Sequence, residues 1–264
     1  MCVTSAPVPA SSSGRYWSIE IKTLFQFELC SYPASLFDTK LLMRQPDKSD
    51  LQNALTKRAQ ASIMTETPDD ALFVIDGGSM LQHVPWPRVA SYADIVKLYI
   101  QYLHHNFPHS VVVFDGYTNG PSTKDETHQR RAGKEMGVDV DISLDMTLKM
   151  KKKPFLANEK NKQRFINLLG IEMEKESNIQ AIHSSGDADL DIVKTALHLS
   201  LAKQVILVGE DTDLLVLLLY HYSRDLHTEV YMQTATKVIN INILQETIGK
   251  DLSNSLLFLH ALTG

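Results

Sequence analysis

Four short apolar runs, each followed at once or within a few residues by acidic side chains, constrain the fold of this chain more than any other feature of its sequence. The runs are strand-like and cover residues 71–75, 111–114, 179–183 and 204–208. Helix-like stretches lie around residues 92–105, 190–202 and 214–222. Such alternation favours a parallel sheet covered by helices on both faces. The sequence therefore predicts the α/β fold class.

Acidic residues follow all four runs. They are Asp76, Asp115, Asp187, Asp189, Asp211 and Asp213. One acid after a strand is most simply a helix N-cap or a turn residue. Four strand ends with acids, two of them spaced as D-x-D, favour a shared site instead, because the carboxyl ends of parallel strands lie at one ligand-binding edge. We expect these six side chains to converge. We interpret Asp191 and Glu210 as a helix-surface acid and a loop acid, and the alternative is that either one contacts and orients the converging carboxylates.

Convergence of six carboxylates creates an electrostatic conflict. Two carboxylates about 4 Å apart repel by about 4 kcal/mol at an effective dielectric near 20. Bound divalent cations remove this repulsion. Carboxylate oxygens without nearby Cys or paired His select hard ions, Mg²⁺ or Mn²⁺, and two such ions suit in-line phosphoryl chemistry. The residues therefore predict a two-metal site that hydrolyses phosphodiester bonds.

Four motifs containing these acids resemble, in order, those of the flap endonuclease and XPG-type 5′ nucleases. The motifs are IDGG at 75–78, FDGY at 114–117, SSGDADLDIV at 184–193 and GEDTDLLVL at 209–217. The similarity spans about residues 71–264 and implies a PIN-like three-layer fold with a central parallel sheet. It makes the six aspartates metal ligands, with Asp187 and Asp189 where the family usually has glutamates.

The resemblance also assigns roles to basic residues. The family has a Lys and an Arg, seven residues apart after the FDG motif, that grip the scissile phosphate, and Lys124 and Arg131 have that separation. Further cations expected to contact nucleic acid are Arg130, Lys134, Lys151, Lys152 and Lys153. Residues 124–164 hold 11 Lys and Arg against 7 Asp and Glu. A basic insertion over about residues 120–165 would thus form an arch above a single strand, and the alternative is a solvated charged helix.

Domain organisation follows from the extent of this match. Residues 1–66 carry no recognisable chemistry and are interpreted as a tail and appendage, and residues 67–264 as the nuclease domain. In the family, an apolar helix resembling LLFLHALTG precedes a further metal-ligand Asp and a duplex-binding element. The sequence reaches Gly264 at the end of that helix, so we expect the domain to be incomplete at its C-terminus.

Composition bounds the compartment and the partners. The chain has two cysteines, too few for a disulfide scaffold, which indicates a reducing intracellular location, with the nucleus favoured. The longest apolar run, residues 214–220, is far shorter than the roughly 20 residues that span a bilayer, so we expect no membrane contact. The expected partner is DNA with single-stranded flaps or ends. Two hypotheses result: a metal-dependent, structure-selective nuclease, or a catalytically silent PIN-like module that binds nucleic acid or protein.

Overall fold

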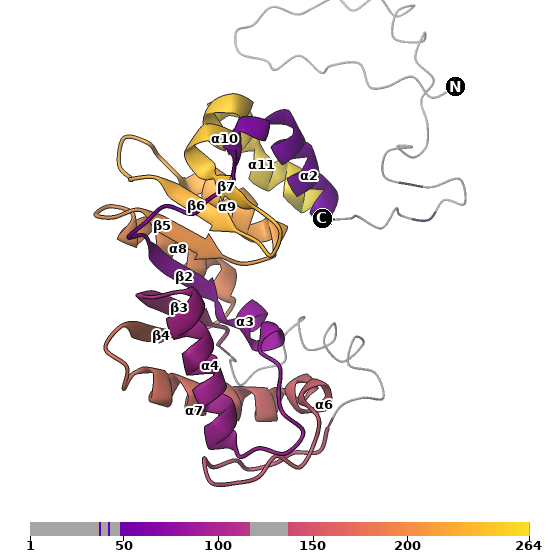
Figure 1. The fold of residues 1–264 in the computed structure, drawn as a ribbon. Coiled ribbons are helices and arrows are strands. Elements are labelled where there is room, and N and C mark those ends of the chain that lie inside the picture. The colour runs from indigo at the N-terminus through magenta and orange to yellow at the C-terminus, as the bar shows by residue number, and fades with distance from the viewer. Residues whose placement is uncertain (1–36, 38–41, 43–47, 117–136, 264) are drawn as a thin grey trace, which may run out of the picture. The chain divides into compact units, whose positions relative to one another are not determined.

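A seven-stranded, mostly parallel sheet organises the part of the chain that the structure describes (Figure 1). The structure is a computed structural model, and it describes residues 37, 42, 48–116 and 137–263. Lys48–His260 form one unit. Its strands are β1 (Ile63–Met64), β2 (Leu72–Asp76), β3 (Ser110–Phe114), β4 (Ile179–His183), β5 (Val205–Val208), β6 (Val230–Gln233) and β7 (Val238–Asn240).

The strand order is β1-β7-β6-β5-β2-β3-β4. Strands β4, β3, β2, β5 and β6 are parallel to one another, whereas β7 pairs antiparallel with both β6 and β1. The four predicted strands, β5, β2, β3 and β4, lie side by side in the parallel part of the sheet, with β4 as its edge strand. The near-continuous apolar sequences of β5, β2 and β3 suit their interior positions, because a parallel strand between two others is buried on both faces.

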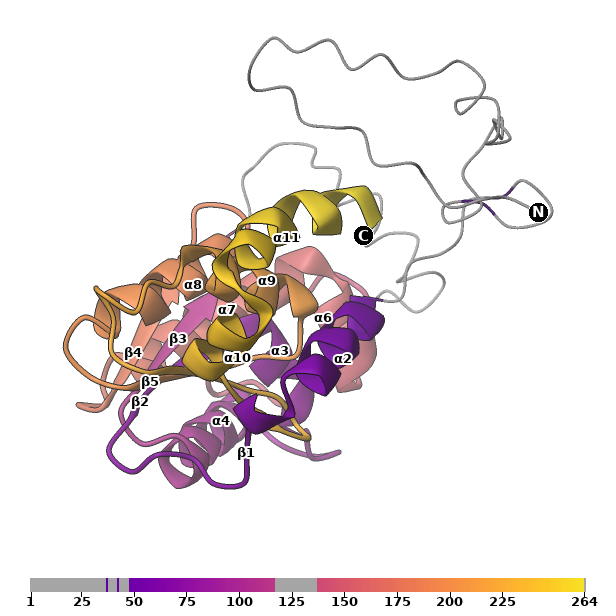
Figure 2. The same ribbon diagram turned by 90° about the horizontal axis from the view of Figure 1, so that it is seen from above.

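Helices cover both faces of the sheet, as the α/β prediction requires (Figure 2). They are α2 (Lys48–Arg58), α3 (Gly77–His83), α4 (Tyr92–Asn106), α6 (Lys152–Ala157), α7 (Glu159–Met173), α8 (Ala188–Leu199), α9 (Thr212–His221), α10 (Ile241–Ile248) and α11 (Lys250–Thr263), with a short 3₁₀ turn at Gln60–Ser62. Among the described residues, no helix combines the length and apolar character needed to cross a membrane. The fold class is therefore confirmed as a sheet between helical layers.

The alternation of side chains along each strand divides the core into two layers. Val74 and Val113 face a cluster formed with α2, α8, α9, α10 and α11. Their neighbours Ile75, Val112 and Phe114 face the opposite cluster, with α3, α4, α6 and α7. Successive side chains of a strand point to opposite faces, so one apolar run supplies both layers.

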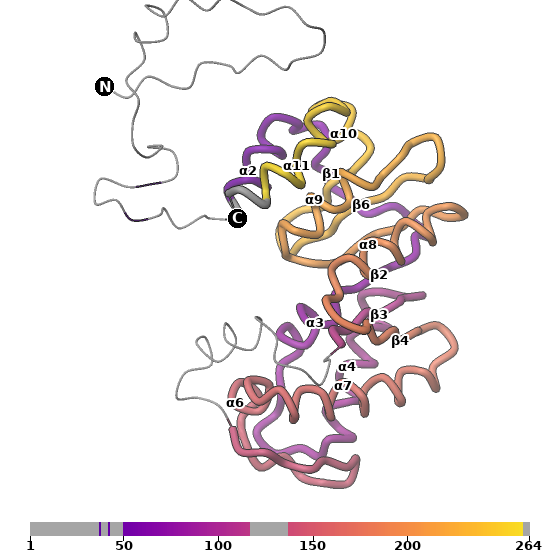
Figure 3. The backbone as a smooth tube through the Cα atoms, turned by 180° about the vertical axis from the view of Figure 1, so that it is seen from behind, coloured from indigo at the N-terminus to yellow at the C-terminus, as the bar shows by residue number. Residues whose placement is uncertain are grey.

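The unit begins before the boundary expected at residue 67. Leu55 and Ala59 belong to the first core cluster, and Ile63 pairs with Ile239 across β1 and β7. Helix α2 lies beside α10 and α11 when the molecule is seen from behind (Figure 3). Residues 48–66 are thus part of the sheet domain, because their apolar side chains fill its core.

The expected arch is also corrected over its described part. Residues 117–136 lie outside the described residues, but α6 and α7 pack into the second core layer. Phe155 and Phe165 are fully buried, with their rings 5.3 and 5.0 Å from that of Trp86. The end of the basic segment therefore belongs to the core, since its aromatic side chains recur on the inner faces of two helices.

Candidate metal centre

The six predicted aspartates lie at one edge of the sheet, where four neighbouring parallel strands end. Strand β2 ends at Asp76, and Asp115 follows β3. The segment after β4 brings Asp187 and Asp189, and the segment after β5 brings Asp211 and Asp213, each pair at the start of a helix. The parallel arrangement of the strands places these segments together, because all four carboxyl ends share one edge.

Three of these carboxyl groups lie within ion-binding distance of one another, and charge interactions relate the other three to them. Carboxylate oxygens of Asp189, Asp211 and Asp213 all lie within 4.8 Å of one another. A methyl group on Gly78 would lie 3.2 Å from Oδ1 of Asp76 and 3.7 Å from Oδ2 of Asp115. Charges link the remainder: Asp189 interacts with Asp76, Asp187, Asp211 and Asp213, and Asp76 interacts with Asp115. Three of the six carboxylates therefore lie close enough together to share an ion, and the charges of the other three interact with members of this group or with one another.

Three of these acids also cap helices. An acid after a strand can therefore serve here both as a helix N-cap and as a member of the acidic site. Asp76 accepts a hydrogen bond from the backbone N–H of Ser79 at 3.1 Å, at the start of α3. Asp187 caps α8 and Asp211 caps α9, each through the N–H two residues later. The positive ends of these helices therefore lie at the acidic cluster and offset part of its negative charge.

Burial and the repulsion between neighbouring carboxylates both favour the protonated form of two side chains in the cluster. Burial, followed by the charges of four neighbouring aspartates, raises the pKa of Asp189 to about 7. Burial and the charges of Asp115 and Asp211 also raise the pKa of Asp76, although the N–H groups of Ser79 and Gly78 oppose the change. A site of this kind is stabilised by a proton or a cation. Its donors are carboxylate oxygens, which fit Mg²⁺ or Mn²⁺, and the closest three can hold one such ion.

The glycine of the FDG motif allows two strand ends to touch. A Cβ atom on Gly116 would lie 1.7 Å from the carbonyl oxygen of Ser184. The Gly116 N–H donates to the carbonyl of Gly186 at 3.1 Å, and Asp115 accepts from the N–H of Ala188 at 3.2 Å. The ends of β3 and β4 are thus joined directly beside the acidic cluster.

We expect Gly116→Ala to destabilise the protein by about 1–3 kcal/mol, because the added methyl group must push these two segments apart. Chemical denaturation measures the change in the free energy of unfolding. Gly186→Ala is the matched control, since a Cβ atom there meets nothing within 4 Å. An unaltered midpoint for Gly116→Ala would contradict the close approach.

Two residues of the site were not predicted. His260 Nε2 lies 2.6 Å from Oδ1 of Asp213, and Lys162 Nζ lies 3.8 Å from Oδ2 of Asp115. Neither has a local sequence signal, because each is 47 positions from its partner. Helical periodicity offers one clue for His260, which follows the buried Ser253 and Leu256 on the inner face of α11.

The predicted basic residues are only partly covered by the structure. Four of them lie outside the described residues: Lys124, Arg130, Arg131 and Lys134. Lys151 and Lys153 are exposed at the start of α6. Lys152 instead donates hydrogen bonds to the carbonyls of Gln82 and Val84, each at 2.7 Å, and burial lowers its pKa to about 8. Its ammonium group binds carbonyls at the end of α3, which corrects its assignment to nucleic-acid contact.

A basic groove lies beside this end of α3. It encloses about 530 Å³ and is lined by Trp86, Pro87, Arg88, Leu148, Lys149, Met150, Lys151 and Lys152. Arg88, Lys149 and Lys151 are exposed along it. Helix α3 begins at the acidic cluster, and its seven residues span about 10 Å, so the groove lies roughly one helix length from Asp76.

Comparison with known proteins adds no family assignment. The sequence matches no protein-family model and no curated protein. The assignment of a function to the site therefore rests on the positions and charges of its own residues.

Proposed function

We propose that this protein is a metal-dependent nuclease with a PIN-like fold, which hydrolyses phosphodiester bonds in DNA at flaps, forks or ends. The observation that carries this proposal is the carboxylate cluster, in which oxygens of Asp189, Asp211 and Asp213 lie within 4.8 Å of one another. The order of the four acidic motifs along the chain supports the same conclusion.

The proposal places two hard ions among six carboxylates, which are Asp76, Asp115, Asp187, Asp189, Asp211 and Asp213. It is supported by the three closest of them, Asp189, Asp211 and Asp213, which can hold one ion. Two Mg²⁺ or Mn²⁺ ions supply activation of water and neutralisation of charge on the phosphate. The chain itself orients the carboxylates, because three of them are fixed as helix caps. Lys162 adds a cation beside Asp115, where it can also attract a phosphate.

Nucleic acid would extend from this cluster along α3 to the basic groove. The phosphates of a single strand suit the exposed cations of this groove, and Trp86, whose ring packs against Phe155 and Phe165, forms part of its wall. The ammonium group of Lys152 is held by hydrogen bonds to the carbonyls of Gln82 and Val84 and so fixes one wall of the groove. The exposed Arg88 and Lys151 would contact phosphate.

Neutralising Arg88 and Lys151 together, as Arg88→Ser/Lys151→Ser, is expected to weaken the binding of single-stranded DNA. Each lost phosphate contact should reduce the slope of log K against log salt concentration by about 0.7. Fluorescence anisotropy at several salt concentrations measures both quantities. The control Lys175→Ser/Lys203→Ser removes the same charge near the amino ends of β4 and β5. Equal losses in the two variants would show an effect of net charge and contradict the groove assignment.

The direct test is incubation of the 264-residue chain with labelled 5′-flap DNA in EDTA, in Mg²⁺ and in Mn²⁺. We expect cleavage near the flap junction only in the presence of an ion. Binding of the flap without cleavage in either ion would favour the silent binding module. Cleavage in EDTA would contradict metal-dependent chemistry.

A further inference from the structure

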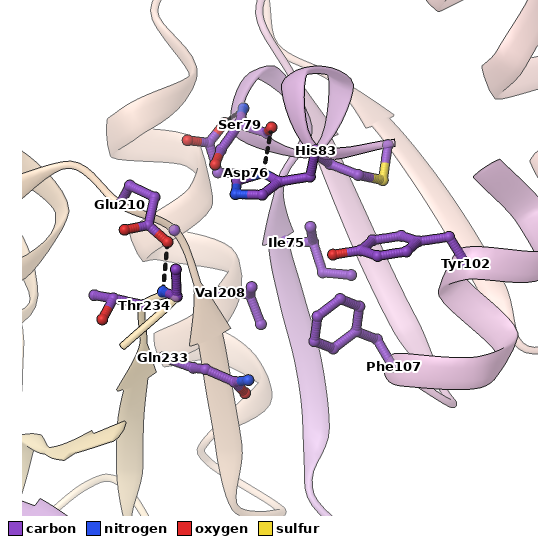
Figure 4. A pocket seen from close by; sticks show the side chains of 13 residues that line it. Ile75, Asp76, Ser79, His83, Tyr102, Phe107, Val208, Glu210, Gln233 and Thr234 are labelled. Atoms are coloured by element: carbon purple, nitrogen blue, oxygen red, sulfur yellow. Dashed lines mark hydrogen bonds between the residues drawn. The ribbon is translucent and has the colours of Figure 1, made fainter. Parts of the chain in front are cut away.

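A second concave feature, the side pocket, opens next to the acidic cluster (Figure 4). It encloses about 280 Å³. Ile75 and Val208 line it from the sheet, and Tyr102 and Phe107 line it from the end of α4. Asp76 lines both this pocket and the acidic cluster, so a molecule in the pocket would lie directly beside the proposed metal centre.

The walls of the side pocket are suited to a ligand with a flat, apolar face. The rings of Tyr102 and Phe107 meet edge to face, with centroids 5.7 Å apart. In Figure 4 the Tyr102 side chain extends toward Ile75, and Phe107 lies opposite Val208. The volume is close to the low end of ligand pockets, which hold roughly 300–1,000 Å³. The space therefore suits one heterocycle and is too small for a folded segment.

One wall carries an unsatisfied acceptor. Oε1 of Gln233, at the end of β6, is buried and has no hydrogen-bond partner among the described residues. The Gln233 side chain extends into the view beneath Val208 and Phe107 in Figure 4. Buried polar atoms in native proteins nearly always have a partner, and an exception points to a water or a ligand. Gln233 lines the pocket, so a rotation of its amide group would bring this atom within reach of a ligand that carries a hydrogen-bond donor on its edge.

Charge decides which part of a nucleotide fits here. The acids Asp76 and Glu210 lie among the lining residues, and Glu210 accepts a hydrogen bond from the N–H of Ala235 at 2.6 Å. A phosphate in this position would be repelled by both carboxylates. An uncharged base is not repelled, and its faces gain from contact with aromatic and aliphatic side chains.

We propose that the side pocket receives a nucleobase of the DNA strand that is cleaved, with adenine preferred. This inference rests on the proposed function, since the phosphate attached to that base would lie at the acidic cluster. Adenine fits Gln233 best, because a glutamine amide can accept from N6 and donate to N7 of adenine at once. The pocket would thereby hold the strand in register at the scissile bond and give the enzyme a preference for the adjoining base.

The test uses adenosine, which has no phosphate, and the full chain in EDTA, so that binding is independent of metal and of cleavage. Saturation-transfer NMR and titration calorimetry should detect adenosine binding, with thymidine at least about tenfold weaker. Gln233→Leu keeps the size of the side chain but removes the acceptor, and it should weaken adenosine binding at least about tenfold. The matched control is Gln180→Leu on β4, where the glutamine is exposed, and it should bind as the unaltered protein does.

A second variant, Val208→Phe, fills the pocket and keeps the test valid if Gln233→Leu fails to fold. Adenosine binding that persists in both variants, equal binding of thymidine, or no binding to the unaltered protein would overturn the inference. Adenosine binding with these losses but no cleavage of flap DNA would overturn the proposed nuclease function and leave the base pocket. Cleavage of flap DNA without adenosine binding would overturn the base pocket and leave the proposed nuclease function.

Discussion

Asp211→Asn/Asp213→Asn is expected to reduce metal-dependent cleavage of flap DNA at least about a thousandfold. The two side chains supply two of the three carboxylates whose oxygens lie within 4.8 Å of one another. Loss of an ion that stabilises the transition state by several kcal/mol corresponds to such a factor, because each 1.36 kcal/mol is tenfold in rate. Initial rates on a 5′-flap substrate in Mg²⁺ and in Mn²⁺ measure the effect.

Asparagine is chosen because it preserves the fold around the site. Asp211 caps α9 by accepting from the N–H of Asp213 at 3.0 Å, and asparagine caps helices about as well as aspartate. The control Asp69→Asn/Asp70→Asn makes the same change of charge before β2, near the opposite edge of the sheet, where both acids are exposed. It should cleave at the normal rate. Equal rates for both double variants would place the activity in another site or in a contaminant.

The metal-free protein is expected to lose stability as the pH rises from about 4 to about 7. Burial and four neighbouring aspartates raise the pKa of Asp189 from 3.8 to about 7 in the folded state. The folded chain therefore holds a proton in this range that the unfolded chain has released, so unfolding releases protons and becomes easier as the pH rises. Above about pH 7 both states are ionised at this group, and its contribution becomes constant. Thermal denaturation in EDTA across this range gives the profile.

The same experiment with Mg²⁺ or Mn²⁺ separates the effect of the cluster from other titrations. An ion at about 100 times its dissociation constant stabilises the folded state by about 2.7 kcal/mol, or roughly 5–10 °C for a domain of this size. Asp189→Asn should flatten the EDTA profile and reduce the response to the ion. Asp225→Asn, in the turn after α9, should change neither. A melting temperature that increases with pH in EDTA, or that ignores both ions, would contradict the cluster.

The fold class could be predicted because the central strands carry their own signal. Runs such as Val205–Val208 are apolar at every position. This pattern is typical of a parallel strand that is covered by other elements on both faces. The start of the domain could not be read in this way. Strand β1 has two residues, and α2 lacks a clear apolar face, so their place in the fold depends on contacts with β7 and α10 far along the chain.

Predictions for the basic residues show the same limit. A lysine in a charged run has the same sequence signal whether its ammonium group meets water, phosphate or a carbonyl. Lys152 donates to two carbonyls at the end of α3, and Lys162 lies beside Asp115. No local sequence pattern distinguishes either of these lysines from the exposed Lys151. The partner of a flexible cation is fixed by the packing of the helices around it.

By itself the sequence determined that acids follow four apolar runs, because the order of side chains is a local property of the chain. The alternation of these runs with helical stretches favours parallel strands, whose carboxyl ends share one edge. Only the tertiary structure decided how far apart those oxygens lie, that His260 and Lys162 join them, and that Gln233 lines a pocket beside Asp76. Apart from the neighbours Asp211 and Asp213, these residues come from parts of the chain that lie tens to more than 150 positions apart. Their distances are set by the packing of whole helices and strands against one another, which no short stretch of sequence contains.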